Sequence, residues 1–230
     1  MTKLKAMVLG ACALMFTSVV TTPLIAGSGD FAGPYIGIKA SLNGLELDGK
    51  YTDNSSEVTN GTAGAIAGGA AAELGYNLPL GESFLLGVGI QYNPEQLKLN
   101  GDAGEGDSDS DSGDVTINLE DHWSIFIQPT VSFTDSSAVY LKYGFSHIDA
   151  SFSGDIHMPP GSITGDIVGI GTRTMFANGM FLQMEGGMEI YSQLDLAGGG
   201  NKLPSKGPNK TSLKADPTVA YASMTLGYRF

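Results

Sequence analysis

The chain has little cysteine, little basic charge and no long hydrophobic run after its first residues. Its one cysteine is Cys12, so disulfide bridges are excluded and no later residue can act as a thiolate nucleophile or metal ligand. Its 12 lysines and arginines stand against 24 aspartates and glutamates, which excludes nucleic acid as a partner, because phosphate binding needs a basic surface. No later stretch is apolar over about 18 residues, which excludes membrane-spanning helices there.

The N-terminal segment has the order of a secretory signal. Lys3 and Lys5 precede an apolar stretch, and small residues lead to Ala26. We therefore expect a signal peptide over residues 1–26 that is cleaved near Ala26, followed by a single domain over residues 27–230.

Two alternatives compete with this interpretation of the N-terminal segment. A membrane helix would need about 20 apolar residues, and Pro23 interrupts this run early. A lipoprotein signal is suggested by residues 9–12, which end in Cys12, although most of the apolar stretch lies after that cysteine. The cleavable signal fits the whole segment best.

From residue 33 onward, apolar and polar residues alternate with a period of two over eight segments. Alternation without long apolar runs is typical of a transmembrane β-barrel, and a bacterial barrel closes with an even number of strands. The predicted fold class is therefore all-β, an eight-stranded antiparallel up-and-down transmembrane barrel. The predicted strands cover residues 35–42, 65–78, 84–93, 115–133, 139–146, 166–176, 180–192 and 218–230.

The gaps between these strands alternate between short and long. Barrels of this kind keep short turns on the periplasmic side and long loops outside the cell, so both termini are expected in the periplasm. Pro129 lies within the fourth strand and predicts a bulge there. The short gaps are 79–83, 134–137 and 177–179, and the long gaps are 43–62, 94–114, 149–164 and 193–216.

Several short motifs repeat an aromatic–glycine pattern along the strands. They are Gly33-Pro34-Tyr35-Ile36-Gly37, Leu74-Gly75-Tyr76-Asn77, Tyr143-Gly144-Phe145-Ser146 and Leu226-Gly227-Tyr228-Arg229-Phe230. Over roughly residues 31–230 the chain resembles the superfamily of small outer-membrane barrels that includes OmpA-type transmembrane domains and opacity-protein-like, porin-family barrels. The resemblance implies the outer membrane of a Gram-negative bacterium. It also implies that Leu226, Tyr228 and Phe230 form the signal that the barrel-assembly machinery reads.

The alternation turns seven charged side chains toward the lumen. An eight-stranded barrel is only wide enough for side chains to fill it, so we expect these charges to pair across the lumen as a structural polar core. The alternative is a narrow, gated conduction path whose ion pairs exchange partners. The predicted luminal charge network consists of Lys39, Glu73, Lys142, Arg173, Glu185, Glu189 and Arg229.

Two long loops carry opposite charge. Asp107, Asp109 and Asp111 alternate as in a calcium-binding loop, but the glycine is displaced and the final glutamate is missing, so a solvated acidic loop is the better interpretation. The last long loop contains basic residues that could meet the acidic loop or lipopolysaccharide phosphates. These residues are Lys202, Lys206, Lys210 and Lys214.

Catalysis has little support in the sequence. Three histidines, His122, His147 and His157, lie near serines, and His147 is predicted to face lipid at the outer rim. Ser146, however, is predicted to face inward, and no motif indicates a triad, so no enzyme activity or cofactor is expected.

The predicted role is that of a surface protein. Its polar loops would contact an extracellular protein or surface ligand in adhesion, envelope integrity, or host or phage contact, and its barrel would contact membrane lipid and lipopolysaccharide. A small porin-like channel is the alternative, and a lipid-modifying enzyme is a third hypothesis.

Overall fold

The alternating segments fold into a closed ring of antiparallel strands. The computed structural model describes residues 28–52, 58–94, 97–102, 114–154, 161–197 and 212–230. Eight long strands form the ring, and two short strands extend it at one end. The long strands are β1 (Gly33–Thr52), β2 (Val58–Pro79), β3 (Phe84–Asn93), β5 (Asp114–Thr134), β6 (Ser137–Gly154), β7 (Gly161–Met175), β8 (Met180–Tyr191) and β10 (Ser212–Arg229), and the short ones are β4 (Leu97–Asp102) and β9 (Leu194–Ala197).

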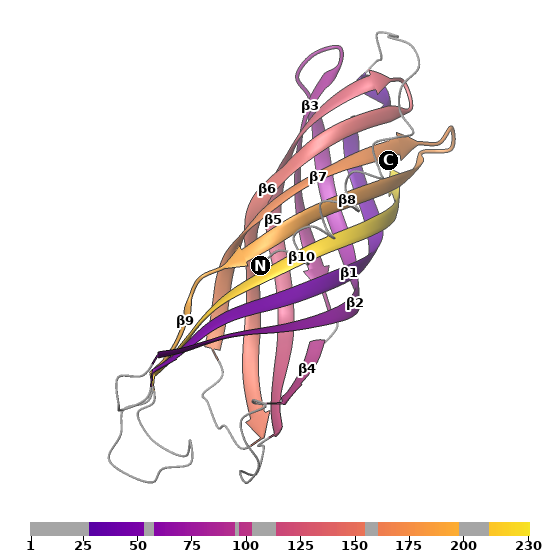
Figure 1. Cartoon of the computed structure of the whole chain (residues 1–230). Coiled ribbons are helices and arrows are strands. Elements are labelled where there is room, and N and C mark those ends of the chain that lie inside the picture. Colours follow the sequence, from indigo (N-terminus) through magenta and orange to yellow (C-terminus); the bar gives the residue numbers. More distant parts are fainter. Residues whose placement is uncertain (1–27, 53–57, 95–96, 103–113, 155–160, 198–211) are drawn as a thin grey trace.

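The ring closes where the first strand pairs with the last. β1 and β10 are antiparallel from Tyr35↔Arg229 to Thr52↔Ser212. Every other pair of neighbours in the ring consists of long strands that follow one another in the chain, which makes this an up-and-down barrel (Figure 1). The predicted eight-stranded fold is confirmed.

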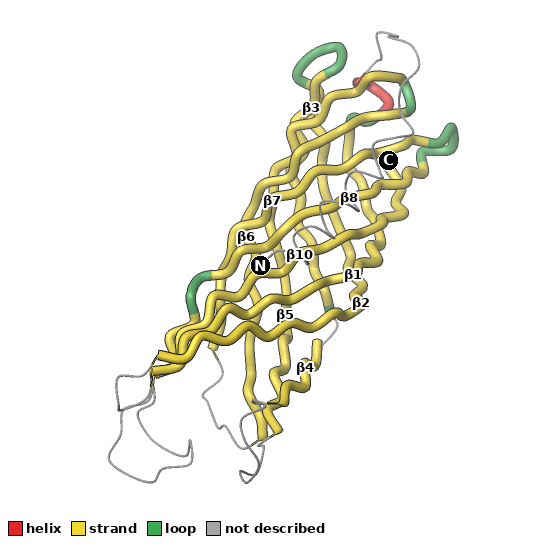
Figure 2. The backbone as a smooth tube through the Cα atoms, viewed as in Figure 1, coloured by secondary structure: helices red, strands yellow, loops and turns green. Residues whose placement is uncertain are grey.

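The two ends of the barrel differ. The short connections, together with a 3-10 turn over Ser28–Asp30, lie at the end that also holds the C-terminus (Figure 2). Because barrels of this kind keep their short turns on the periplasmic side, we call this end the periplasmic end and the opposite end, which carries the strand extensions, the extracellular end.

Most of the large apolar side chains on the strands face outward, as predicted. Ile38, for example, is 72% exposed, whereas its neighbour Lys39 is 3% exposed. The same alternation holds on β10, where Met224 and Leu226 are exposed and Thr225 is buried. The outer wall is therefore a band of aliphatic and aromatic side chains around a polar interior.

Six of the eight long strands are longer than predicted, and β3 and β8 are not. β1 has 20 residues and β2 has 22, about twice the 9–11 residues that cross a bilayer. Much of the predicted loops 43–62, 94–114, 149–164 and 193–216 is thus strand. Outside the bilayer no apolar face is required, so the alternation fades from the sequence while the backbone ladder continues.

At the extracellular end the ring opens into two sheets. β2 pairs with β3 only from Ala72 to Pro79, and beyond that point β2, β1, β10 and β9 form one extension. β4, β5 and β6 form the other extension (Figure 1).

The prediction of a bulge at Pro129 is wrong. The register of β5 and β6 is the same on both sides of it, with Ile127 opposite Tyr143 and Thr130 opposite Tyr140. Pro129 thus fits the strand without an inserted residue. The register shifts lie instead between Glu120 and Trp123 and between Ser132 and Thr134.

The shift before Trp123 inserts one residue into β5. Asp121 has a positive φ of 49°, which is uncommon for a residue other than glycine and marks the bulge. Alternation from the inward-facing Ser124 already turns His122 inward, and the bulge shifts the alternation only for the β5 residues that precede it.

Several predicted features lie outside the described residues. They are the signal peptide over residues 1–26, the aspartates Asp107, Asp109 and Asp111, the histidine His157, and the basic residues Lys202, Lys206 and Lys210.

Candidate functional site in the barrel lumen

The periplasmic end of the lumen is filled by apolar side chains around Phe31. Phe31 lies just before β1 and is 1% exposed. Leu85 and Phe181, which pack in the same cluster, are fully buried. The remaining members of this cluster are Tyr35, Ala138 and Met175, so that β1, β3, β6, β7 and β8 all contribute. We refer to Ser28–Ala32, which carries Phe31, as the Phe31 plug.

Hydrogen bonds fasten the Phe31 plug to the barrel at both of its ends. The Ser28 N–H donates to the Glu82 carbonyl at 2.6 Å, and the Ser28 hydroxyl donates to the Gly81 carbonyl at 2.6 Å. Asn77 Nδ2 donates to the Phe31 carbonyl at 2.9 Å, and Arg229 Nη1 donates to the Ala32 carbonyl at 3.0 Å. The plug thus connects the first periplasmic turn to the last strand.

Arg173 lies directly above the plug. Its Nε and Nη2 donate to Gln183 Oε1 at 3.0 and 2.7 Å, and Nη2 also donates to Gln128 Oε1 at 3.2 Å. The guanidinium carbon lies 4.6 Å from the centre of the Tyr35 ring and 5.0 Å from that of Phe181. Amides and aromatic faces therefore hold this buried cation.

Two lysines and two glutamates meet at mid-barrel. Lys39 Nζ lies 3.2 Å from Glu185 Oε1 and 3.4 Å from Glu73 Oε2. Lys142 Nζ lies 3.3 Å from Glu185 Oε1 and 3.8 Å from Glu73 Oε2. We call these four residues the charge cluster. Each cation faces both anions, so the two charges of each sign balance.

Tyrosine hydroxyls complete the shell of the charge cluster. Tyr140 and Tyr221 donate to Glu185 at 2.8 and 3.0 Å, and Tyr35 donates to Glu73 at 3.0 Å. These donors come from three different strands, so the carboxylates are held from several sides of the lumen. Such satisfaction is what allows charges to be buried.

Inward-facing glycines make room for the aromatic rings of neighbouring strands. A Cβ at Gly75 would lie 2.4 Å from the Tyr35 ring, and one at Gly171 would lie 2.3 Å from the Tyr140 hydroxyl. The glycine-rich inner faces therefore contain rings packed over backbone, rather than open space. The periplasmic half of the lumen is filled.

The seven predicted luminal charges divide into separate groups. The charge cluster unites Lys39, Glu73, Lys142 and Glu185, but the other three lie elsewhere. Among the described residues, neither Arg173 nor Arg229 forms an ion pair with a carboxylate. Arg173 is held by amides, and Arg229 is partly buried at the periplasmic end. This corrects the expectation of one continuous network, because pairing requires similar height along the barrel axis as well as an inward direction.

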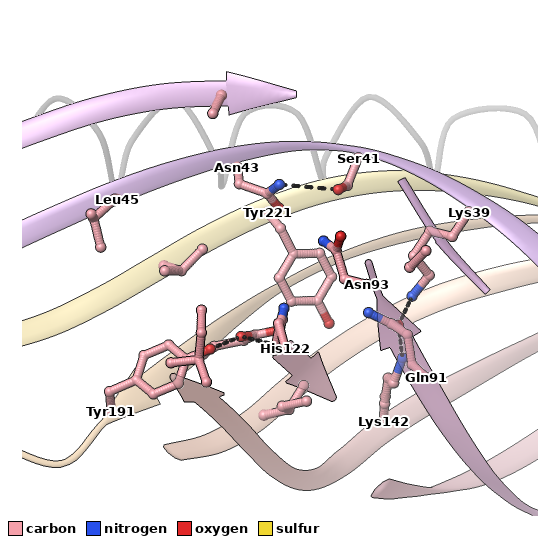
Figure 3. Close-up of a pocket in the computed structure, with 16 residues that line it drawn as sticks. Lys39, Ser41, Asn43, Leu45, Gln91, Asn93, His122, Lys142, Tyr191 and Tyr221 are labelled. Carbon is pink, nitrogen blue, oxygen red and sulfur yellow. Dashed lines mark hydrogen bonds and ion pairs between the residues drawn. The ribbon is translucent and has the colours of Figure 1, made fainter. Parts of the chain in front are cut away.

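Above the charge cluster, toward the extracellular end, the lumen contains a cavity of about 50 Å³. Lys39, Gln91 and Lys142 gather at one end, and Tyr191 lies at the other (Figure 3). Asn93 lies between the two ends. By volume, the cavity holds about three or four water molecules.

His122 and Glu189 line this cavity together with Tyr191. His122 Nε2 lies 2.8 Å from Ser146 Oγ and 3.3 Å from Glu189 Oε2. Ser146 Oγ lies 3.2 Å from Glu189 Oε2 and 2.9 Å from the hydroxyl of Tyr191, which also donates to Glu189. We call these four residues the histidine cluster.

The histidine cluster lacks the geometry of a catalytic triad. In a triad, one ring nitrogen of the histidine faces the serine and the other faces the acid. Here Nε2 of His122 faces both Ser146 and Glu189, and Ser146 is 1% exposed.

His147 faces the outer surface instead of the lumen. Its ring stacks on Trp123 with centroids 5.3 Å apart, and its Nε2 lies 3.3 Å from Asp149 Oδ1. The outward direction predicted for His147 is thus confirmed, and it lies on the opposite face of β6 from Ser146.

An apolar outer band around a charged and closed interior is the arrangement that a lipid bilayer requires of a strand-built protein. The chain is a transmembrane β-barrel. The part of the chain that the structure describes contains no helix long and apolar enough to cross a membrane. No protein-family model matches the chain, and no curated protein matches it in sequence.

Several solved structures match the chain over most of its length at low sequence identity. OprG from Pseudomonas aeruginosa is 14% identical with a TM-score of 0.45, and the match covers 86% of this chain and 97% of that one. Ail, the attachment invasion locus protein of Yersinia pestis, is 13% identical with a TM-score of 0.43, covering 84% and 99%. The outer membrane protease OmpT from Escherichia coli is 11% identical with a TM-score of 0.40, covering 93% and 99%. The barrel has little sequence in common with them.

Two features of the lumen were missed by sequence reasoning. Phe31 precedes the first strand and belongs to no alternating pattern, so no local signal marks it as buried. His122 shares the inward face of β5 with Ser124 by simple alternation, but alternation does not show that the strand registers bring it within reach of Glu189.

Proposed function

We propose that this outer-membrane barrel is a non-conducting surface protein whose extracellular strand extensions form an interaction surface. One observation carries the proposal: the periplasmic half of the lumen is filled by the Phe31 plug, the amides around Arg173 and the charge cluster. A water path would have to displace all three layers. The lumen therefore serves to hold the barrel rigid.

The interaction surface would be built on the two extensions. The ladder of β1 and β2 continues to Thr52↔Val58, and that of β4 and β5 continues to Asp102↔Asp114. Continuous backbone ladders are stiff, so a partner that contacts the strand extensions would meet little cost of ordering. The partner would be an extracellular protein or surface ligand, with lipopolysaccharide around the barrel wall.

The proposal includes the route to the membrane. Residues 1–26 would direct export and be removed near Ala26, and the barrel-assembly machinery would recognise Leu226, Tyr228 and Phe230. These three side chains are exposed on the outer wall at the end of β10 and after it, where another protein can contact them.

Planar-bilayer recordings test the absence of conduction. We expect the wild-type protein and Arg173→Ala to be silent, because the plug and the charge cluster remain in both. Phe31→Ala should also be silent, since the charge cluster still closes the lumen. Steady single-channel currents through the wild-type protein would refute the proposal.

Hairpin trimming tests the interaction surface. In one variant an Asn-Gly turn replaces residues 48–62, so that the β1–β2 ladder ends at the pair Leu47↔Ala63. In a matched variant the same turn replaces residues 98–118, so that the β4–β5 ladder ends at Leu97↔Leu119. Both barrels should still insert, and at least one should lose adhesion of bacteria to host cells or phage adsorption. If both trimmed barrels keep all surface binding of the wild type, the extensions are not the interaction surface.

A further inference from the structure

Glu189 is a buried carboxylate without a lysine or arginine partner. It is 6% exposed, and among the described residues His122 is the one basic side chain within 4 Å of it. Its other contacts are the neutral hydroxyls of Ser146 and Tyr191. A buried charge requires a counter-charge, and a histidine supplies one only while it is protonated.

The contacts of Glu189 with the described residues share a further property. The contacts with His122, Ser146 and Tyr191 are all made by Oε2. Oε1 thus remains available to an occupant of the cavity that Glu189 lines. A carboxylate oxygen can accept up to two hydrogen bonds.

The charges around the cavity determine the sign of the occupant. The lysines at its far end, Lys39 and Lys142, are balanced by Glu73 and Glu185. Among the described side chains, no lysine or arginine balances the charge of Glu189. An anion would be repelled there, and a cation would complete the balance.

The walls near Glu189 determine the chemical class of the occupant. Ile148, Ile167 and Val219 line the cavity there and present aliphatic surface. The side chains of Tyr191 and Tyr221 also line it (Figure 3). Aliphatic walls favour an alkyl chain, and aromatic faces favour an organic ammonium.

A metal ion fits this site less well. Hard cations take six or more oxygen ligands, whereas the described residues contain no group of three or more histidines, cysteines, aspartates or glutamates that could hold a metal. A volume of about 50 Å³ limits an organic occupant to a few heavy atoms.

We propose that the cavity binds a small primary amine, with its ammonium at the Glu189 carboxylate and its short alkyl chain against Ile148, Ile167 and Val219. The Phe31 plug and the charge cluster block the periplasmic route, so the amine enters from the extracellular end. This binding site goes beyond the proposed surface role, and neither depends on the other.

Calorimetry on the full-length protein, refolded in detergent micelles at pH 8, tests the site with n-butylammonium as the probe. From its five non-hydrogen atoms we expect a Kd of roughly 1–10 mM. Glu189→Gln should weaken binding at least about tenfold, because it removes the charge and keeps the shape. Glu46→Gln is the matched control, since Glu46 is another buried carboxylate of the barrel but does not line the cavity, and it should bind as the wild type does.

A second variant keeps the test independent of changes in charge. Ala67→Leu fills the cavity from β2 and should abolish binding, while heat-modifiable migration on a gel reports whether the barrel is folded. Binding of butanol or butyrate as tight as that of butylammonium would overturn the proposal. So would unchanged binding in Glu189→Gln, or displacement of butylammonium by equimolar sodium or potassium, which would indicate an inorganic cation site.

Discussion

Removing one charge from the charge cluster tests whether its four residues act as a unit. Glu185→Gln keeps the shape of the side chain but leaves the cations of Lys39 and Lys142 with Glu73 as their one anion. Breaking a buried ion pair from one side costs about 3–5 kcal/mol, because the remaining charge is buried without compensation. Glu185 also accepts hydrogen bonds from Tyr140 at Oε2 and from Tyr221 at Oε1; glutamine keeps one acceptor oxygen, and a tyrosine hydroxyl can accept a hydrogen bond from its NH2 group. We therefore place the loss of unfolding free energy at the lower end, about 3 kcal/mol.

The matched change on the other side is Lys142→Met, which keeps an unbranched side chain but removes the cation, whose Nζ lies 3.9 Å from the centre of the Phe126 ring. Alone it should also cost about 3 kcal/mol, because the two glutamates then share one cation. The double variant Lys142→Met with Glu185→Gln restores one charge of each sign, on Lys39 and Glu73. It should be more stable than the sum of the single losses predicts, by about 2 kcal/mol or more.

The assay is reversible urea unfolding of the barrel in lipid vesicles, followed by circular dichroism and by migration on unheated gels. All four proteins of the cycle are measured at the same pH and salt concentration, so that differences in unfolding free energy reflect the substitutions alone. Additive losses, with a coupling energy near zero, would show that the charges act independently. In that case the reasoning from a shared cluster would be wrong.

Three further predictions follow from the wall and the ends of the barrel. Gly171→Ala should lower the unfolding free energy by about 1–3 kcal/mol, because its Cβ would lie 2.3 Å from the Tyr140 hydroxyl. Its control in the same unfolding assay is Gly161→Ala on the same strand, which meets nothing within 4 Å and should leave the unfolding free energy unchanged. Trp123, the one tryptophan, is 41% exposed on the outer wall, so brominated lipids should quench its fluorescence. Quenching no stronger than that by brominated detergent in the aqueous phase would place Trp123 outside the bilayer. Phe230→Ala should slow assembly in cells, but the unfolding free energy of the folded barrel should stay within about 0.5 kcal/mol of the wild-type value, since Phe230 is 70% exposed. Normal assembly of this variant would exclude Phe230 from the recognition signal.

The sequence predicts the barrel wall well because lipid imposes a strict pattern. Residues such as Ile38, Leu226 and Lys39 differ so strongly in their transfer to lipid that their faces can be read from alternation alone. Beyond the bilayer this constraint ends. The outer halves of β1 and β2 therefore escaped prediction, although their backbone ladders are continuous.

The lumen was less predictable because its contacts depend on height and side-chain length as well as direction. Alternation turns both Lys142 and Arg173 inward, but only the register of eight strands brings Lys142 level with Glu185 and leaves Arg173 level with Gln183. The histidine cluster depends on the same kind of agreement, because the strand registers bring His122 level with Glu189. A periodic pattern contains no information about height along the barrel.

The Phe31 plug has a consequence for the order in which the molecule is assembled. Its hydrogen bond from Arg229 to the Ala32 carbonyl joins residues 197 positions apart, and its pocket needs β3, β6, β7 and β8 in place. Contacts between such distant residues form late in folding, because the intervening chain must be ordered first. The N-terminal segment is thus the first part of the domain to be synthesised and among the last to find its place. Burial of this segment requires that the final strand has paired with the first. The time at which Ser28–Ala32 becomes protected from protease would therefore measure when insertion is complete.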